Sequence, residues 1–189
     1  MSTRAIIARR KGDSWEGNYH HWDGYPSGLG KSLWDMYHTG PYAGRLDDMA
    51  HVLIDEHLGG WSTIVDKDWT KEPGFQEYSA DTPSVIEEPE AYAEWAEEHN
   101  QPQCYCHGDR SEGPYPLLGP NADAGAEWVY VLDVEEHTMS VYEAARADER
   151  HAVGMFGFNP GRAAWVLRGV VDLDGAEPDW GRLDAGLGT

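Results

Sequence analysis

The residue types best suited to chemistry gather in one short stretch, Tyr19 to Ser32. It contains two histidines and an aspartate, and histidine with a carboxylate is a minimal set for acid–base work or metal ligation. Adjacent histidines on a strand face opposite sides of a sheet, so only one of them can reach any single site. The neighbouring aromatic rings would form a stacking wall for a ring-bearing ligand. The residues expected to bind a ligand here are His20, His21, Trp22, Asp23, Tyr25, Ser27, Gly28 and Lys31.

The same stretch has the composition of a turn from a strand into a helix. Ser27 is a favourable N-cap, and a helix that begins at Ser27 or Gly28 presents free backbone N–H groups and the positive end of its dipole. With Lys31 nearby, this turn could hold a phosphate or carboxylate. Its Gly-Lys-Ser end is similar to a nucleotide-binding P-loop, but Tyr25 stands where the first glycine belongs. The alternative without a ligand is a rigid turn that pins the helix to the sheet.

A second group of candidate residues is Cys104, Cys106 and His107. Cysteine and histidine are the usual zinc ligands, although structural sites commonly leave two to four residues between the thiolates and need four ligands in all. A remote histidine, such as His99 or His20, would have to complete the site. The alternative is a turn with incidental thiols. Zinc is therefore the one cofactor that the sequence suggests, and a disulfide across a single intervening residue is disfavoured.

Local patterns place these residues on a β-rich framework with helices in the middle of the chain. Alternation and turn composition predict hairpins near each terminus, and stripes of apolar residues at helical spacing predict helices between them. The expected strands are 3–10, 15–22, 61–65, 127–133, 138–144 and 163–173, the expected helices are 27–39, 46–58 and 90–99, and the expected loops are 66–89 and 100–125.

This order of elements lacks regular βαβ alternation. It predicts an α+β fold, in which a mainly antiparallel sheet is built from N- and C-terminal hairpins and about three helices pack on it. We expect a single domain over residues 1–175 and a flexible acidic tail over 176–189.

The net charge of the chain is −20, from 34 acidic and 14 basic residues. Direct binding to nucleic acid or to an anionic membrane would need the opposite sign. Three explanations of the acidity stay open: a solvated surface, a partner with a basic surface (including mimicry of nucleic acid), and carboxylates gathered around a metal. No apolar run is long enough for a membrane span or a signal peptide, so we expect a cytoplasmic protein.

Three segments carry a resemblance to a group of proteins from actinobacteria and their phages. They are Ser2–Ile7, His20–Gly30 and Ala126–Asp133, and the first two follow the pattern S-T-R-A-hydrophobic … H-x-D-G-Y-P-x-G. The resemblance covers roughly the first forty residues and the later strand. It implies an actinobacterial or phage setting, with the host cytoplasm as location in the phage case, and it transfers no catalytic residue.

These observations lead to one main hypothesis and two alternatives. The main hypothesis is a small acidic phage-type binding protein, acting on a host or defence pathway through a protein partner or a small anionic, nucleotide-like ligand. The first alternative is a hydrolase that uses His21 and Asp23, with or without a metal. The second is an inhibitor that mimics nucleic acid. The residues leave open whether the protein is an enzyme.

Overall fold

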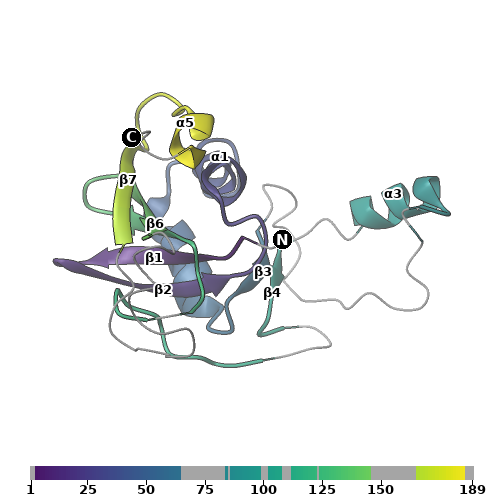
Figure 1. The fold of residues 1–189 in the computed structure, drawn as a ribbon, viewed down its shortest axis with the longest axis horizontal. Coiled ribbons are helices and arrows are strands. Elements are labelled where there is room, and N and C mark those ends of the chain that lie inside the picture. The colour runs from purple at the N-terminus through teal and green to yellow at the C-terminus, as the bar shows by residue number, and fades with distance from the viewer. Residues whose placement is uncertain are drawn as a thin grey trace.

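The fold is described by a computed structural model that places residues 3–64, 84, 86–98, 102–107, 112–122, 124–145 and 165–185. It is α+β, with a seven-stranded, mostly antiparallel sheet in the order β4-β3-β2-β1-β5-β6-β7 (Figure 1). The fold class predicted from the sequence is therefore confirmed. No helix among these residues has the length and apolar character needed to span a bilayer.

The two predicted hairpins form the larger part of the sheet. In the first, β1 (Ala5–Lys11) pairs antiparallel with β2 (Ser14–His20), and Gly12 makes the turn with φ +57°. In the second, β5 (Trp128–Asp133) pairs with β6 (Thr138–Ala144), which also pairs with β7 (Trp165–Asp172). All five of these strands were predicted from the sequence.

A parallel pairing of β1 with β5 joins the two hairpins in the centre of the sheet. Both strands are buried on both faces, which explains why they read as nearly continuous apolar runs. Successive side chains point to opposite faces. One set, which includes Ile7 and Tyr130, packs in the main core, and the other, which includes Ile6 and Val129, packs in a smaller cluster.

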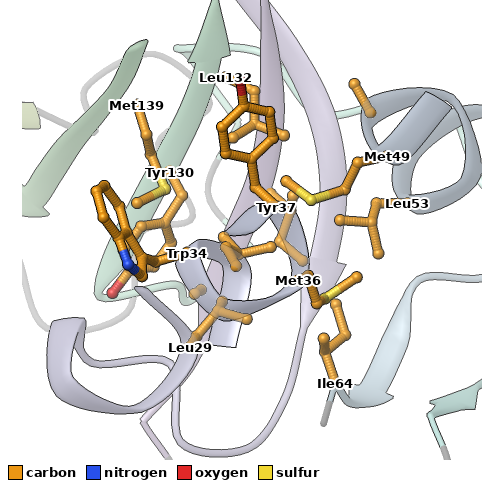
Figure 2. Close-up of a cluster of buried hydrophobic side chains, with 14 of the residues drawn as sticks. Leu29, Trp34, Met36, Tyr37, Met49, Leu53, Ile64, Tyr130, Leu132 and Met139 are labelled. Atoms are coloured by element: carbon orange, nitrogen blue, oxygen red, sulfur yellow. The ribbon is translucent and has the colours of Figure 1, made fainter. Parts of the chain in front are cut away.

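Helical segments cover the face of the sheet that carries the main core (Figure 2). A π-helical turn η1 (Pro26–Gly30) leads directly into α1 (Lys31–His38), and α2 (Leu46–Ala50) continues as a π-helical segment η2 (His51–Glu56). The apolar stripes expected from the sequence, from Leu29 to Tyr37 and from Leu46 to Ile54, are the buried faces. Helix α3 (Pro89–Glu98) lies away from the sheet in Figure 1.

Two short strands lie at the other end of the sheet from β7. They are β3 (Trp61–Thr63), which was expected, and β4 (Gln103–Cys104), which falls within a predicted loop. Because β4 has only two residues, it has no periodicity for a sequence to show. Most of the predicted loop 66–89 lies outside the described residues, whereas 102–107, 112–122 and 124–125 of the predicted loop 100–125 are described.

Two further expectations need correction. Ser27 does not cap the first helix, because the helical path begins at Pro26 with Tyr25 in the N-cap position and no side-chain cap. Within the expected flexible tail, α5 (Trp180–Asp184) is a packed helix capped by Asp179. The Trp180 side chain is 7% exposed and belongs to the main core, so apolar burial holds this segment in place.

Candidate metal centre and adjoining pocket

Four metal-ligating side chains converge beside the β3–β4 end of the sheet: His57, Cys104, Cys106 and His107. His57 follows η2, and Cys104 is the last residue of β4. The antiparallel pairing of Trp61 with Cys104 brings these distant segments together. The turn after β4 then supplies the other two ligands, so one long-range strand pairing assembles the whole group.

The donor atoms of the four side chains lie within 4.8 Å of one another. The Cys106 sulfur is 3.4 Å from His57 Nδ1, 3.5 Å from the Cys104 sulfur and 3.5 Å from His107 Nδ1. The Cys104 sulfur is also 3.1 Å from His107 Nδ1. Three of the donors thus form a closed triangle, with the His57 nitrogen beside it.

A tetrahedral zinc site requires this kind of spacing. Zinc–sulfur bonds of about 2.3 Å and zinc–nitrogen bonds of about 2.0–2.1 Å place pairs of donors roughly 3.3–3.8 Å apart. The four measured separations, 3.1–3.5 Å, are close to this range. Two thiolates and two neutral imidazoles also balance the charge of a divalent ion, which matters where the ligands are buried.

Burial makes a thiolate unfavourable at this place unless a cation accompanies it. The Cys104 side chain is fully buried, and that burial, with the hydrogen bond from Cys106, raises the pKa of the Cys104 thiol to about 12. His57 is also buried, and its ring lies 4.6 Å from the ring of Trp61. A thiolate-binding ion such as Zn²⁺ would supply the missing positive charge.

The surrounding residues hold His57 and the cysteine turn in position. The buried side-chain amide of Asn18 donates to the carbonyls of Leu53, Ile54 and His57, at 3.2, 2.8 and 3.1 Å. These bonds satisfy the C-terminal carbonyls of η2. Gly59 allows the two segments to approach, because a Cβ there would lie 2.8 Å from the Cys106 nitrogen.

The structure thus brings together the three residues that the sequence proposed for zinc, and it adds a fourth. That residue is His57, not His20; the other suggestion, His99, lies outside the described residues. His57 is 49 positions from Cys106, and no local motif links them. Only the β3–β4 pairing could have revealed it.

His20 and His21 point to opposite faces, as expected from a strand. His20 is 1% exposed, and neither of its ring nitrogens has a hydrogen-bond partner among the described residues. Burial, with a smaller contribution from His21, lowers the pKa of His20 to about 3, so the ring is neutral. His20 therefore occupies the core and does not face a ligand site.

The predicted anion site is engaged by acidic side chains of the same chain. The Ser27 amide donates to the Asp184 carboxylate at 3.1 Å, and the Gly28 amide donates to the Tyr25 carbonyl at 3.0 Å. Lys31 pairs with Asp35 at 2.6 Å and lies 3.7 Å from Glu177. The Ser27 amide and Lys31 thus have carboxylate partners within the chain, which is compatible with the alternative of a turn without a ligand.

His21 and Trp22 line a pocket of about 590 Å³ next to the four-ligand cluster. Their backbone amides donate to the carbonyls of Trp61 and Ser62 in β3, at 3.0 and 3.1 Å. The described residues that line it are Asn18, Tyr19, His21, Trp22, Leu58, Gly59, Gly60, Ser62, Tyr105, Glu112, Tyr115, Pro116, Leu118 and Ala124. Only two of the eight residues expected to bind a ligand are among them.

The two residues of the hydrolase alternative, His21 and Asp23, lie in different surroundings. His21 Nδ1 lies 2.9 Å from the Tyr19 hydroxyl, while Asp23 is exposed and lies outside the pocket lining. Asp23 has a positive φ of +53°, and its carbonyl accepts from the Leu29 amide at 2.8 Å. Its observed role is therefore in the turn.

Comparison of the chain with protein-family models, with curated proteins and with solved structures finds no match. The function has to follow from the residues of the site itself.

Proposed function

We propose that this protein binds one zinc ion through His57, Cys104, Cys106 and His107, and that the ion stabilises the β3–β4 end of the sheet. The single observation that carries the proposal is the mutual spacing of the four donor atoms, all within 4.8 Å. The combination of two sulfurs and two imidazole nitrogens in a tetrahedron is typical of zinc.

The proposed role of the ion is structural. A catalytic zinc site keeps one coordination position open for water or substrate, whereas four protein ligands close the site. The ligands also come from two segments whose direct strand pairing is very short, Trp61 with Cys104 and Thr63 with Gln103. An ion held by both segments would fix their relative position, which the pairing alone does weakly.

The direct test is the metal content of the purified protein, measured by inductively coupled plasma mass spectrometry. We expect about one zinc per chain in the wild type and a large loss in Cys104→Ser and in His57→Ala. His51→Ala is the matched control, because His51 is an exposed histidine that pairs with Asp55 in η2 and is not among the four ligands. Its zinc content should equal that of the wild type.

Cobalt substitution tests the ligand set independently. Replacing zinc by Co²⁺ should give the intense visible bands of tetrahedral cobalt and a thiolate-to-cobalt charge-transfer band, both lost in Cys104→Ser. The proposal is wrong if the wild type takes up no stoichiometric zinc or cobalt, or if Cys104→Ser takes up as much as the wild type. An iron–sulfur cluster in its place would be recognised by its iron and sulfide content.

A further inference from the structure

The pocket beside the cluster is walled by aromatic rings set nearly at right angles. The ring of His21 lies 4.6 Å from that of Trp22 and 5.9 Å from that of Tyr19, with interplanar angles of 70° and 69°. The ring of Tyr105 is 6.5 Å away at 81°. All four residues belong to the pocket lining. These rings line the same pocket and contact one another edge to face.

Two kinds of charge act near this pocket: a carboxylate in its described lining, and the guanidinium of Arg4 outside it, whose positive charge acts on His21 and Tyr19. Among the described lining residues there is one carboxylate, Glu112, and no lysine or arginine. The Tyr115 hydroxyl donates to Glu112 at 3.3 Å, and the charge of Glu112 raises the pKa of Tyr115. Burial and the nearby Arg4 lower the pKa of His21, so His21 is uncharged at neutral pH and does not repel a cation. Arg4 itself lies outside the lining.

We propose that this pocket binds a small organic cation through a methylated (quaternary) ammonium group. Such groups are recognised by aromatic side chains, since the negative faces of the rings attract a cation that has no hydrogen bonds to lose. The volume of about 590 Å³ lies within the range of small-molecule sites and exceeds what a trimethylammonium group alone would fill. The pocket therefore has room for the rest of a small ligand beside its ammonium group.

The metal centre supports one wall of this pocket. Tyr105 lies between two of the proposed zinc ligands, and Leu58, Gly59 and Gly60 follow His57. The Tyr105 amide donates to the Gly60 carbonyl at 3.0 Å, and the Tyr115 amide donates to the Leu58 carbonyl at 2.9 Å. The ligand proposal itself depends on the rings and the carboxylate, so it can fail or hold whether or not the ion is zinc.

Isothermal titration calorimetry with three probes tests the proposal on protein of measured metal content. The probes are choline, its neutral isostere 3,3-dimethylbutan-1-ol, and adenosine monophosphate, which represents the anionic ligand expected from the sequence. We expect choline to bind about tenfold or more tightly than the alcohol, in line with the strength of a desolvated cation–π contact. Adenosine monophosphate should bind more weakly than choline.

Two variants locate the binding. Trp22→Ala, at a side chain that is 47% exposed, should weaken choline binding about tenfold. Glu112→Gln should weaken choline binding and leave binding of the neutral alcohol unchanged. Tyr25→Ala is the matched control, since Tyr25 is a partly exposed aromatic residue of the same turn that lies outside the lining. It should bind choline like the wild type.

Several outcomes would overturn the inference. They are no choline binding, equal binding of the alcohol, preference for adenosine monophosphate, or choline binding that neither Trp22→Ala nor Glu112→Gln weakens. If a trimethyl-lysine peptide binds more tightly than choline, the proposal of a free small molecule is wrong, and the ligand is a methylated lysine of another protein. If the metal content is zero but choline binds as described, the zinc proposal fails and this one holds.

Discussion

The centre of the sheet and its β3–β4 end are held together in different ways. In the centre, β1, β5 and β6 are six or seven residues long, and their register is continuous. At the other end, β3 has three residues and β4 has two, and their register shifts between Trp61 and Thr63. Few backbone hydrogen bonds and little strand length support the second region.

The difference shows what each region needs for stability. The central strands bury apolar side chains on both faces, and burial of this kind stabilises by roughly 25 cal/mol per Å². The β3–β4 end joins segments that are far apart in the chain, so closing the intervening loop costs entropy that two paired residues offset poorly. A metal ion bound by both segments would offset this loss of entropy.

The largest expected effect separates the two regions directly. Cys104→Ser, or chelation of the ion, should lower the free energy of unfolding by about 4 kcal/mol where free zinc is a thousandfold above its dissociation constant. Hydrogen exchange by mass spectrometry should show lost protection at the amides of His21 and Tyr105, which bond to β3 and its flanking turn. Amides of β5 should keep their protection. Equal loss in both regions would contradict a local role for the ion.

A core substitution in the centre of the sheet should lower the stability of the protein without lowering its zinc content. Leu132, in β5, is fully buried, and Leu132→Ala leaves a cavity that costs about 3 kcal/mol in the free energy of unfolding. Urea denaturation measures this loss, and metal analysis should find the same zinc content as in the wild type. Loss of zinc from Leu132→Ala would show that the two regions are coupled.

His20 offers a substitution at the boundary between the regions, since it pairs with both Ala5 of β1 and Trp61 of β3. Its pKa is lowered from 6.5 to about 3 on folding, so the unfolded chain binds a proton that the folded chain does not. Its contribution to stability is therefore lost as pH falls from about 6.5 towards 3. Between pH 7.5 and pH 5 this loss is about 2 kcal/mol.

His20→Leu should remove that part of the acid sensitivity and stabilise the protein at neutral pH, because two buried nitrogens without partners disappear. Urea denaturation of the wild type and the variant at both pH values gives the difference. A variant with the same pH dependence as the wild type would mean that His20 does not titrate on unfolding in this range.

The smallest effect concerns the turn that was expected to bind an anion. Asp184→Ala removes the carboxylate that accepts from the Ser27 amide, and we expect a loss of about 0.5 kcal/mol, as for other charges at helix N-termini. Asp184→Asn keeps an acceptor without the charge and should lose less. Thermal unfolding measures the stability loss of each variant. Neither substitution should change the metal content or the choline affinity.

Local patterns were sufficient for most of the framework. Apolar runs, alternation and turn composition predicted β1, β2, β5 and β6, and the stripe from Leu46 to Leu58 predicted the second helical segment. The two-residue strand β4 was missed because it has no periodicity, and α5 was missed because one buried tryptophan holds an otherwise polar segment. Local composition does not show that one side chain of a short polar segment will be buried in the core.

The same distinction between local patterns and long-range contacts applies to the candidate site. Residue types alone marked Cys104, Cys106 and His107 as candidate metal ligands, and they predicted His21 and Trp22 for a ligand site. The sequence could not connect His57 to the cysteines, or Asp184 to the turn at Ser27, because both contacts join residues far apart in the chain.

The sequence by itself determined the α+β class, the two hairpins, the apolar faces of the helices and the chemical nature of the candidate ligands. These are set by local periodicity and side-chain chemistry. The tertiary structure decided which histidine lies beside the cysteines, that a carboxylate of the same chain accepts from the turn at Ser27, and that aromatic rings line a pocket beside the candidate metal ligands. The physical reason is that long-range strand pairing selects one set of neighbours from many that the local pattern allows equally.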